Sequence, residues 1–394
     1  MMKTVTIPAA PDLTPLNTRP HLMWVDALRV LACFMVVMAH GCDAFVGLFD
    51  ANPQAFLTGS AIGSLMRPCV PLFVMMTAVL IMPVRKDMTL ARFYVKRVGR
   101  ILWPLIFWSL ALPLLMFLYF RTPLGAATSS SLIDVSGYTV DRLGYLSWSW
   151  LLNFTCDTTI MWYLYMLVGI YLIVPLVDGW LNSASRNDLK VLLGVWIVTL
   201  IIPYIRLVAP MLGYQGNYGH MGILGECDWN PYGMFYYVSG FMGYLVLARY
   251  LVRFPLDWSC RKKAGILLPM FLIGYVMTFQ GYVLLQKYFP GNYAFLEIVW
   301  YFCSINVLMM TFPVFVAMQS ITGAASPWLS KLAQLTFGIY LCHFVFEFVG
   351  YDLFDISGLP IWLRIVATSI FSFVAAALVT WLFKQNRYTA RLVS

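Results

Sequence analysis

Residues 25–48 read VDALRVLACFMVVMAHGCDAFVGL, and this stretch decides the fold. It is long enough to cross the roughly 30 Å hydrocarbon core of a bilayer, because a spanning helix needs about 20 mostly apolar residues. Its central part, residues 30–39, carries no charged side chain. The stretch therefore predicts a membrane-spanning helix.

Uncharged runs of similar length recur to the end of the chain. Of the 394 residues, 61% are hydrophobic and only 11% are charged, whereas soluble domains carry about a quarter charged residues. We predict an all-α, polytopic integral membrane helical bundle of about ten transmembrane helices. The expected spans are 25–48, 62–83, 99–119, 160–178, 190–208, 232–250, 264–286, 295–318, 334–352 and 360–384.

Lysine and arginine gather in alternate loops. The loops after the second, fourth and sixth expected spans hold most of them, as does the C-terminal end. Because cytoplasmic loops are enriched in these residues, the N- and C-termini are both predicted to be cytoplasmic. The chain then divides into a short cytoplasmic N-terminal segment (1–23), one membrane domain (24–385) and a cytoplasmic C-terminal tail (386–394).

The same distribution accounts for the net charge of +9. There is no soluble basic module to bind nucleic acid, so we expect no nucleic-acid partner. The histidines and cysteines show no metal-site spacing, and the sequence has no P-loop, GxSxG, HExxH or GxGxxG motif. We expect no metal and no permanently bound cofactor. Cys156 and Cys227 fall in predicted outer loops, which leaves a disulfide between them open.

Four ionisable side chains lie in the first span: Asp26, Arg29, His40 and Asp43. Such groups are costly inside a membrane, so each indicates a functional site by default. Arg29 and His40 are eleven positions apart, which returns to nearly the same helix face about 16 Å further along the axis. Asp26 shares this face, and Asp43 lies within one turn of His40. A histidine beside a carboxylate is a candidate general base.

Structural roles remain open for these residues. Asp26 and Arg29 could extend to the cytoplasmic interface and Asp43 to the outer one. A buried histidine such as His40 is often a packing residue. The shared helix face favours a functional site without excluding these roles.

Other spans hold further candidates. Arg67 lies inside the second span and could pair with a first-span acid. Arg97 and Arg100 share a face where the third span begins, which suits phosphate binding and equally fits the enrichment of cations in cytoplasmic loops. His343 lies in the ninth span and Glu297 begins the eighth, and either could be structural.

Several motifs, in a fixed order, resemble the membrane acyltransferase family 3. WVDALRVLACFMVVMAH (24–40) resembles its first span, where ten residues separate an arginine from a histidine. RPCVPLFVMM (67–76), KRVGRILWP (96–104), MWYLYMLVGIYLIVP (161–175) and FGIYLCH (337–343) resemble its second, third, fourth and late spans. The C-terminal NR…RLVS is most similar to the branch that O-acetylates enterobacterial common antigen. Met76-Thr77 and Thr336 depart from the family pattern, which bears on helix packing and acceptor choice.

The resemblance implies an integral membrane O-acyltransferase in the bacterial cytoplasmic (inner) membrane, with 24–385 as its acyltransferase domain. It would move an acyl group, usually acetyl, from cytoplasmic acetyl-CoA to a hydroxyl of an extracytoplasmic glycan or lipid-linked saccharide. The resemblance also implies membrane lipid as a partner of the protein. The acceptor, the acyl chain and the oligomeric state, a homo-oligomer included, stay open.

The resemblance also implies roles for the candidate residues. Arg29, Arg97 and Arg100 would bind the CoA phosphates. His40 would take the proton of the attacking hydroxyl, with Asp43 or Asp26 tuning it, or would carry the acyl group itself. Arg67 or Tyr340 would stabilise the oxyanion. The remaining candidates for the pocket are Trp162, Glu297 and His343.

Two other classes of protein compete with this interpretation. A transporter or exporter of a glycan or lipid-linked sugar could use the same buried charges to line a pathway. The sequence shows no inverted repeat of the transporter type, which counts mildly against it. A structural subunit of an envelope-synthesis complex would tolerate replacement of Arg29 and His40.

Overall fold

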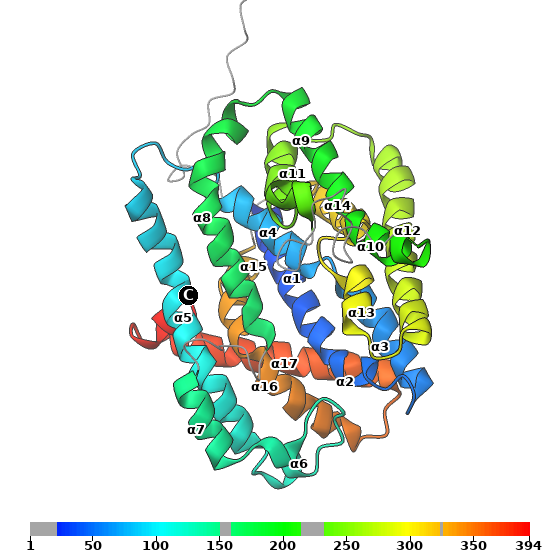
Figure 1. The fold of residues 1–394 in the computed structure, drawn as a ribbon. Coiled ribbons are helices and arrows are strands. Elements are labelled where there is room, and N and C mark those ends of the chain that lie inside the picture. Colours follow the sequence, from blue (N-terminus) through cyan, green and yellow to red (C-terminus); the bar gives the residue numbers. More distant parts are fainter. Residues whose placement is uncertain (1–21, 150–158, 214–231, 324–325) are drawn as a thin grey trace, which may run out of the picture.

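The structure is a computed structural model that describes residues 22–149, 159–213, 232–323 and 326–394 (Figure 1). Cys156 and Cys227 lie outside these residues. The described residues form helices and no strand. The helices are α1 (Met23–Gly41), α2 (Asp43–Val46), α3 (Pro53–Met66), α4 (Cys69–Ile81), α5 (Leu90–Tyr119), α6 (Pro123–Ala126), η2 (Val135–Gly137), α7 (Val140–Ser149), η3 (Thr159–Met161), α8 (Trp162–Ser183), α9 (Arg186–Thr199), α10 (Ile202–Met211), η6 (Gly233–Val238), α11 (Met242–Arg253), α12 (Cys260–Tyr288), α13 (Tyr293–Trp300), α14 (Ile305–Gln319), α15 (Pro327–Ala333), α16 (Thr336–Asp355), α17 (Ile361–Lys384) and η7 (Thr389–Leu392).

Nine stretches of the described residues are long and apolar enough to cross a membrane. They overlap nine of the ten expected spans, so the all-helical membrane bundle is confirmed. The second span begins at Pro53 because Asn52 caps α3, its side chain accepting a hydrogen bond from the Ala55 N–H. The third begins at Leu90, where Thr89 caps α5 in the same way. The cytoplasmic location of both termini stays a prediction.

The expected span 232–250 differs from the prediction. Its described residues form the 3₁₀ helix η6 followed by α11, which has only 12 residues. Gly240 lies between them with φ +72°, a left-handed conformation that ends regular helix. Most of α11 is buried, with Tyr244, Leu245 and Leu251 fully enclosed. α11 is therefore a short interior helix, whose apolar sequence suits a protein core as well as a bilayer.

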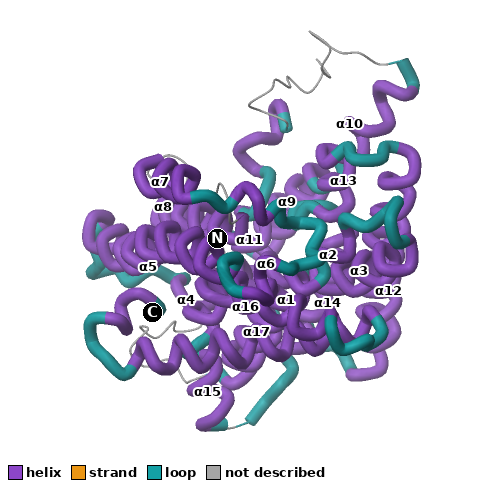
Figure 2. The backbone as a smooth tube through the Cα atoms, turned by 90° about the horizontal axis from the view of Figure 1, so that it is seen from below, coloured by secondary structure: helices purple, strands orange, loops and turns teal. Residues whose placement is uncertain are grey.

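The first span lies in the middle of the bundle. Helix α1 packs against α3, α4, α14, α15, α16 and α17. The packed helices α5 and α8 lie on one side of it, and α12 and α3 on the opposite side (Figure 2). Leu28, Ala32, Cys33 and Val37 have no exposed surface. The polar residues of α1 therefore lie among helices drawn from several parts of the chain.

Close packing of α9 against α11 supplies a test of the fold. A Cβ atom on Gly243 would lie 2.0 Å from the ring of Trp196, which is fully buried and donates from Nε1 to the Gly240 carbonyl. We expect Gly243→Ala to lower the free energy of unfolding by about 1–3 kcal/mol through overpacking. Thermal unfolding of the detergent-solubilised protein measures this.

Gly194→Ala on α9 is the matched control, because a Cβ there would meet nothing within 4 Å. It should leave the unfolding temperature unchanged or raise it slightly, since alanine favours helix over glycine. Equal unfolding temperatures for the two variants would contradict the described packing of α9 on α11.

Candidate functional site

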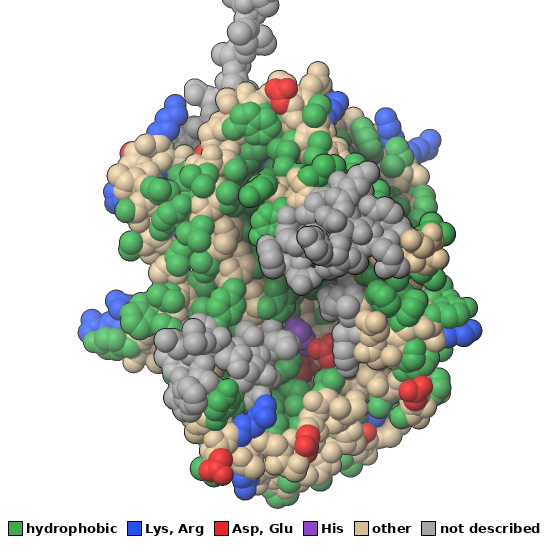
Figure 3. Space-filling model, in the orientation of Figure 1, with side chains coloured by type: hydrophobic (Ala, Val, Ile, Leu, Met, Phe, Trp, Pro, Cys, Tyr) green, Lys and Arg blue, Asp and Glu red, His purple; other side chains and the backbone are tan. Residues whose placement is uncertain are grey.

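A cavity of about 920 Å³ lies alongside α1. Figure 3 shows a hollow in one face of the molecule with a histidine side chain inside it. The His40 side chain is 23% exposed, whereas His343 is fully buried. The structure brings most of the candidate residues together on the wall of this cavity. They are Arg29, His40, Asp43, Arg67, Arg97, Arg100, Trp162 and Tyr340.

One part of the cavity holds the His40–Asp43 pair. Helix α1 ends at Gly41 and α2 begins at Asp43, so the carboxylate turns back toward the imidazole. The Nδ1 atom of His40 lies 2.8 Å from Oδ2 of Asp43. A carboxylate can only accept, so Nδ1 carries the proton of the neutral imidazole and Nε2 keeps its lone pair. His40 is thus arranged to accept a proton at Nε2.

A second histidine lies behind the first. The rings of His40 and His343 are 5.4 Å apart between centroids. Nδ1 of His343 donates to the Tyr340 carbonyl at 2.7 Å, and its Nε2 has no hydrogen-bond partner among the described residues. His343 does not line the cavity. The buried His343 ring therefore lies against the His40 ring and helps to hold it in position.

Sequence reasoning missed Glu347, which lies one turn after His343 on α16. The residue is 5% exposed. A Cβ atom on Gly41 would lie 3.3 Å from its Oε2 and 2.6 Å from the hydroxyl oxygen of Ser369. The carboxyl group therefore lies directly against the backbone next to His40. A lone glutamate in the run FVFEFVG (344–350) was the available signal.

The other part of the cavity is cationic. Arg29 of α1, Arg97 and Arg100 of α5 and Lys384 of α17 all line it. Asp43 is the only acid among the described lining residues. Lys384, another residue that sequence reasoning missed, donates from Nζ to the Gln334 carbonyl at 2.5 Å. Four cations therefore converge on this part of the cavity from three helices, and Asp26 interacts with Arg29 from outside the lining. Such a concentration of positive charge attracts anions.

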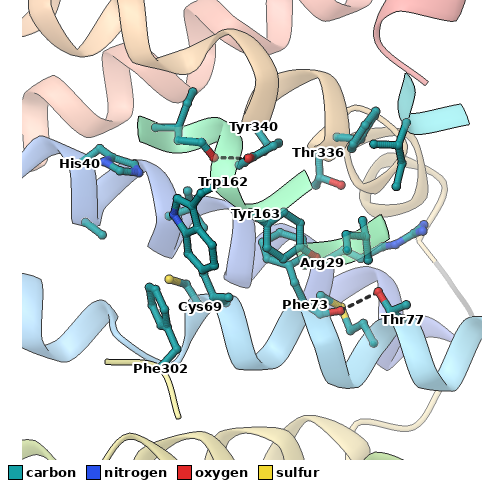
Figure 4. A pocket seen from close by; sticks show the side chains of 18 of the residues that line it. Arg29, His40, Cys69, Phe73, Thr77, Trp162, Tyr163, Phe302, Thr336 and Tyr340 are labelled. Atoms are coloured by element: carbon teal, nitrogen blue, oxygen red, sulfur yellow. Dashed lines mark hydrogen bonds between the residues drawn. The ribbon is translucent and has the colours of Figure 1, made fainter. Parts of the chain in front are cut away.

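Arg67 and two stacked aromatic rings line the same cavity. The guanidinium of Arg67 donates to the Trp300 carbonyl, with Nε at 2.8 Å, and lies 4.1 Å from the centre of the Phe302 ring. The Trp162 ring stacks on the same Phe302 ring, and the two centroids are 5.5 Å apart. The structure gives Arg67 a main-chain carbonyl and an aromatic ring as partners, and its pairing with a first-span acid stays a prediction. Figure 4 shows Trp162 between His40 and Arg29.

Three candidates are less directly placed. The Tyr340 hydroxyl donates to the Ile160 carbonyl, so its proton is already engaged (Figure 4). Asp26 is 6% exposed and lies outside the cavity lining. The side chain of Glu297 lies outside what the structure describes. Of the two carboxylates proposed to tune His40, Asp43 is the one in contact with it.

The departures from the family pattern lie on the cavity wall. Met76, Thr77, Thr336 and Phe337 all line it. The Thr77 hydroxyl donates to the Phe73 carbonyl within α4, and the Thr336 hydroxyl to the Ala333 carbonyl. These hydroxyls satisfy local backbone carbonyls, so the substitutions change the shape of the wall more than its hydrogen-bonding groups.

The His40–Asp43 contact supplies a test of the site. We expect Asp43→Asn to lower the rate of a reaction in which His40 acts as the base about tenfold or more, because an asparagine amide can donate to Nδ1 and so favour the tautomer with the proton on Nε2. Initial rates in purified, reconstituted protein measure this. Asp50→Asn is the control, since Asp50 is exposed and outside the cavity lining. Wild-type rates for Asp43→Asn would remove Asp43 from the site.

Comparison with known proteins identifies the family. Residues 22–383 match the model of the acyltransferase 3 family, described as an acyltransferase domain. No curated protein matches the chain, and no solved structure does. The match covers nearly the whole chain and includes every helix that lines the cavity. Accordingly, the chain belongs to the membrane acyltransferase family 3 and is an acyltransferase.

Proposed function

We propose that this acyltransferase moves an acetyl group from the thioester of acetyl-CoA to a hydroxyl group of an extracytoplasmic glycan. The observation that carries the proposal is the single cavity that joins four cations to the His40–Asp43 pair. One end suits an anionic donor, and the other suits proton transfer. A cavity with both properties fits a reaction between a phosphorylated donor and a neutral hydroxyl.

The cationic end suits the phosphates of CoA. Arginine guanidinium groups bind phosphate oxygens through paired hydrogen bonds. Arg29 and His40 lie on one helix, about 16 Å apart along its axis. This separation is comparable to an extended pantetheine arm, so a donor whose phosphates contact Arg29, Arg97 and Arg100 would present its thioester to His40.

The proposed chemistry follows from the His40 tautomer. Nε2 takes the proton of the acceptor hydroxyl as its oxygen attacks the thioester carbonyl. The carbon–sulfur bond then breaks, and the proton passes from His40 to the leaving thiolate. Asp43 stabilises the imidazolium in between, and Arg67, which lines the same cavity, stabilises the oxyanion. In the alternative route, Nε2 of His40 is the nucleophile that attacks the thioester carbonyl and releases the thiolate. The acceptor hydroxyl then takes the acyl group from the acyl-histidine intermediate.

The location and the acceptor are part of the proposal. The apolar helices support an integral membrane protein, and a CoA donor requires a membrane with access to the cytoplasm, which favours the bacterial inner membrane. The resemblance to the common-antigen branch makes that glycan the first acceptor to test. Its sugars carry hydroxyl groups of the kind that His40 would deprotonate.

Transfer of radiolabelled acetyl groups in membrane vesicles tests this function. Vesicles that contain the protein should incorporate label from acetyl-CoA into extractable glycan, whereas vesicles without it should not. Incorporation into enterobacterial common antigen but not into lipopolysaccharide or peptidoglycan would fix the acceptor. Glycan transport that proceeds without acyl-CoA, and without any labelled glycan, would instead support an exporter.

A further inference from the structure

The C-terminal segment Thr389–Ser394 lies against the bundle and does not extend away from it. Helix η7 packs on α5 and α17, and Figures 1 and 2 both place the C-terminal end beside α5. The side chain of Val393 has no exposed surface. The indole Nε1 of Trp108 on α5 donates to the Leu392 carbonyl at 2.9 Å.

The segment reaches the cavity. Ser394 is one of the lining residues, together with Arg97, Arg100 and Ile101 of α5 and Lys384 of α17. The hydroxyl of Ser394 donates to the Ala390 carbonyl at 2.6 Å, and that of Thr389 to the Phe383 carbonyl at 2.5 Å. One hydrogen bond within the segment and one to the end of α17 therefore hold it in a compact turn, with Ser394 on the wall of the cavity that also holds Arg97 and Arg100.

The contacts of the segment link the helices that carry the cations. Trp108 lies on the same helix as Arg97 and Arg100, and Lys384 ends the helix from which the segment departs. Burying Val393 and pairing the Leu392 carbonyl fixes the end of α17 against α5. Anion sites built from long side chains bind more tightly when their backbones are held in place beforehand, because less freedom is lost on binding.

We propose that Thr389–Ser394 is part of the donor site: it forms a wall of the cavity beside the arginines and holds Arg97 and Arg100 in register with Lys384. The inference rests on the proposed use of acyl-CoA as donor. We assign Thr389–Ser394 a role in binding the donor. We assign it no role in proton transfer, because proton transfer is proposed for His40 and Asp43, which lie outside the segment. Loss of the segment should therefore raise KM for acetyl-CoA and leave kcat nearly unchanged.

The test compares two point variants and one truncated variant of the detergent-solubilised protein. Val393→Ala opens a gap in the buried anchor, Trp108→Phe removes the hydrogen bond to Leu392, and truncation after Tyr388 removes the segment. Tyr388→Ala is the control, because this side chain is 65% exposed and outside the cavity lining. For the truncated protein we expect Kd for CoA and KM for acetyl-CoA to rise about tenfold, with smaller rises for the two point variants.

CoA binding, followed as a rise in unfolding temperature with ligand concentration, separates this inference from the proposed function. If wild-type protein is not stabilised by CoA, the proposed donor is wrong. If wild-type protein and all three variants bind CoA equally, acetyl-CoA remains the proposed donor, and the proposed role of Thr389–Ser394 is wrong. Should the truncated protein fail to fold, Val393→Ala and Trp108→Phe decide the question by the same measurement.

Discussion

His40→Ala should lower the rate of acyl transfer by about 10²–10⁴-fold, the usual contribution of a general base. The loss follows from removing Nε2 of His40, the basic atom of a ring whose Nδ1 is held by Asp43. The variant should still fold, because the His40 side chain is partly exposed in the cavity and is not part of the apolar core. Initial rates with saturating acetyl-CoA, together with the unfolding temperature, measure both expectations.

His40→Gln separates proton transfer from simple hydrogen bonding. Glutamine can donate and accept hydrogen bonds but is not a base, so its rate should fall as far as that of alanine. A glutamine variant near wild-type activity would show that His40 only positions the acceptor. Acid-quenched protein that retains labelled acetyl on His40 would favour the acyl-histidine route over direct transfer.

Arg29→Gln is expected to lower kcat/KM for acetyl-CoA by about 10- to 100-fold, mainly through KM. The reason is the loss of a partly buried guanidinium from the cationic end of the cavity, where Asp26 offsets only part of the positive charge. Arg29→Lys should recover only part of the loss, since an ammonium group lacks the paired donors of a guanidinium.

Lys190→Ala is the control for this change in charge. Lys190 is an exposed cation of α9 that lies outside the cavity lining. The Lys190→Ala variant should therefore have the same KM for acetyl-CoA as the wild-type protein. If Arg29→Gln also left KM unchanged, Arg29 would have a structural role at the membrane interface and the donor site would have to lie elsewhere.

The sequence predicted the fold class well because a bilayer imposes a strong and local rule. A helix that crosses the membrane needs a long apolar run, and nine such runs became helices of spanning length in the described residues. The rule fails for 232–250, where the left-handed Gly240 divides an equally apolar run. Hydropathy cannot distinguish a helix buried in protein from one exposed to lipid, and α11 is of the first kind.

The first-span part of the site was also predictable. Helical periodicity places Arg29 and His40 on one face, and both line the cavity. Proximity within one turn indicated the His40–Asp43 pair, which the structure shows at 2.8 Å. These inferences needed only the geometry of a single helix.

The remaining part of the site depends on which helices meet. Lys384 comes close to Arg29 only because α17 packs on α1, and Phe302 meets Arg67 because the loop before α14 approaches the start of α4. Periodicity gives the direction of a side chain on its own helix but not the identity of the neighbouring helix. Glu347 was detectable as a charge in an apolar span, yet its contact with the backbone beside His40 required the fold.

A structure of the protein with CoA bound tests the central claim most directly. We predict that the phosphates lie within hydrogen-bonding distance of Arg29, Arg97 and Arg100, and that the pantetheine arm follows the cavity so that the thiol lies next to Nε2 of His40. CoA bound outside this cavity, or inside it with the thiol directed away from His40, would contradict the claim.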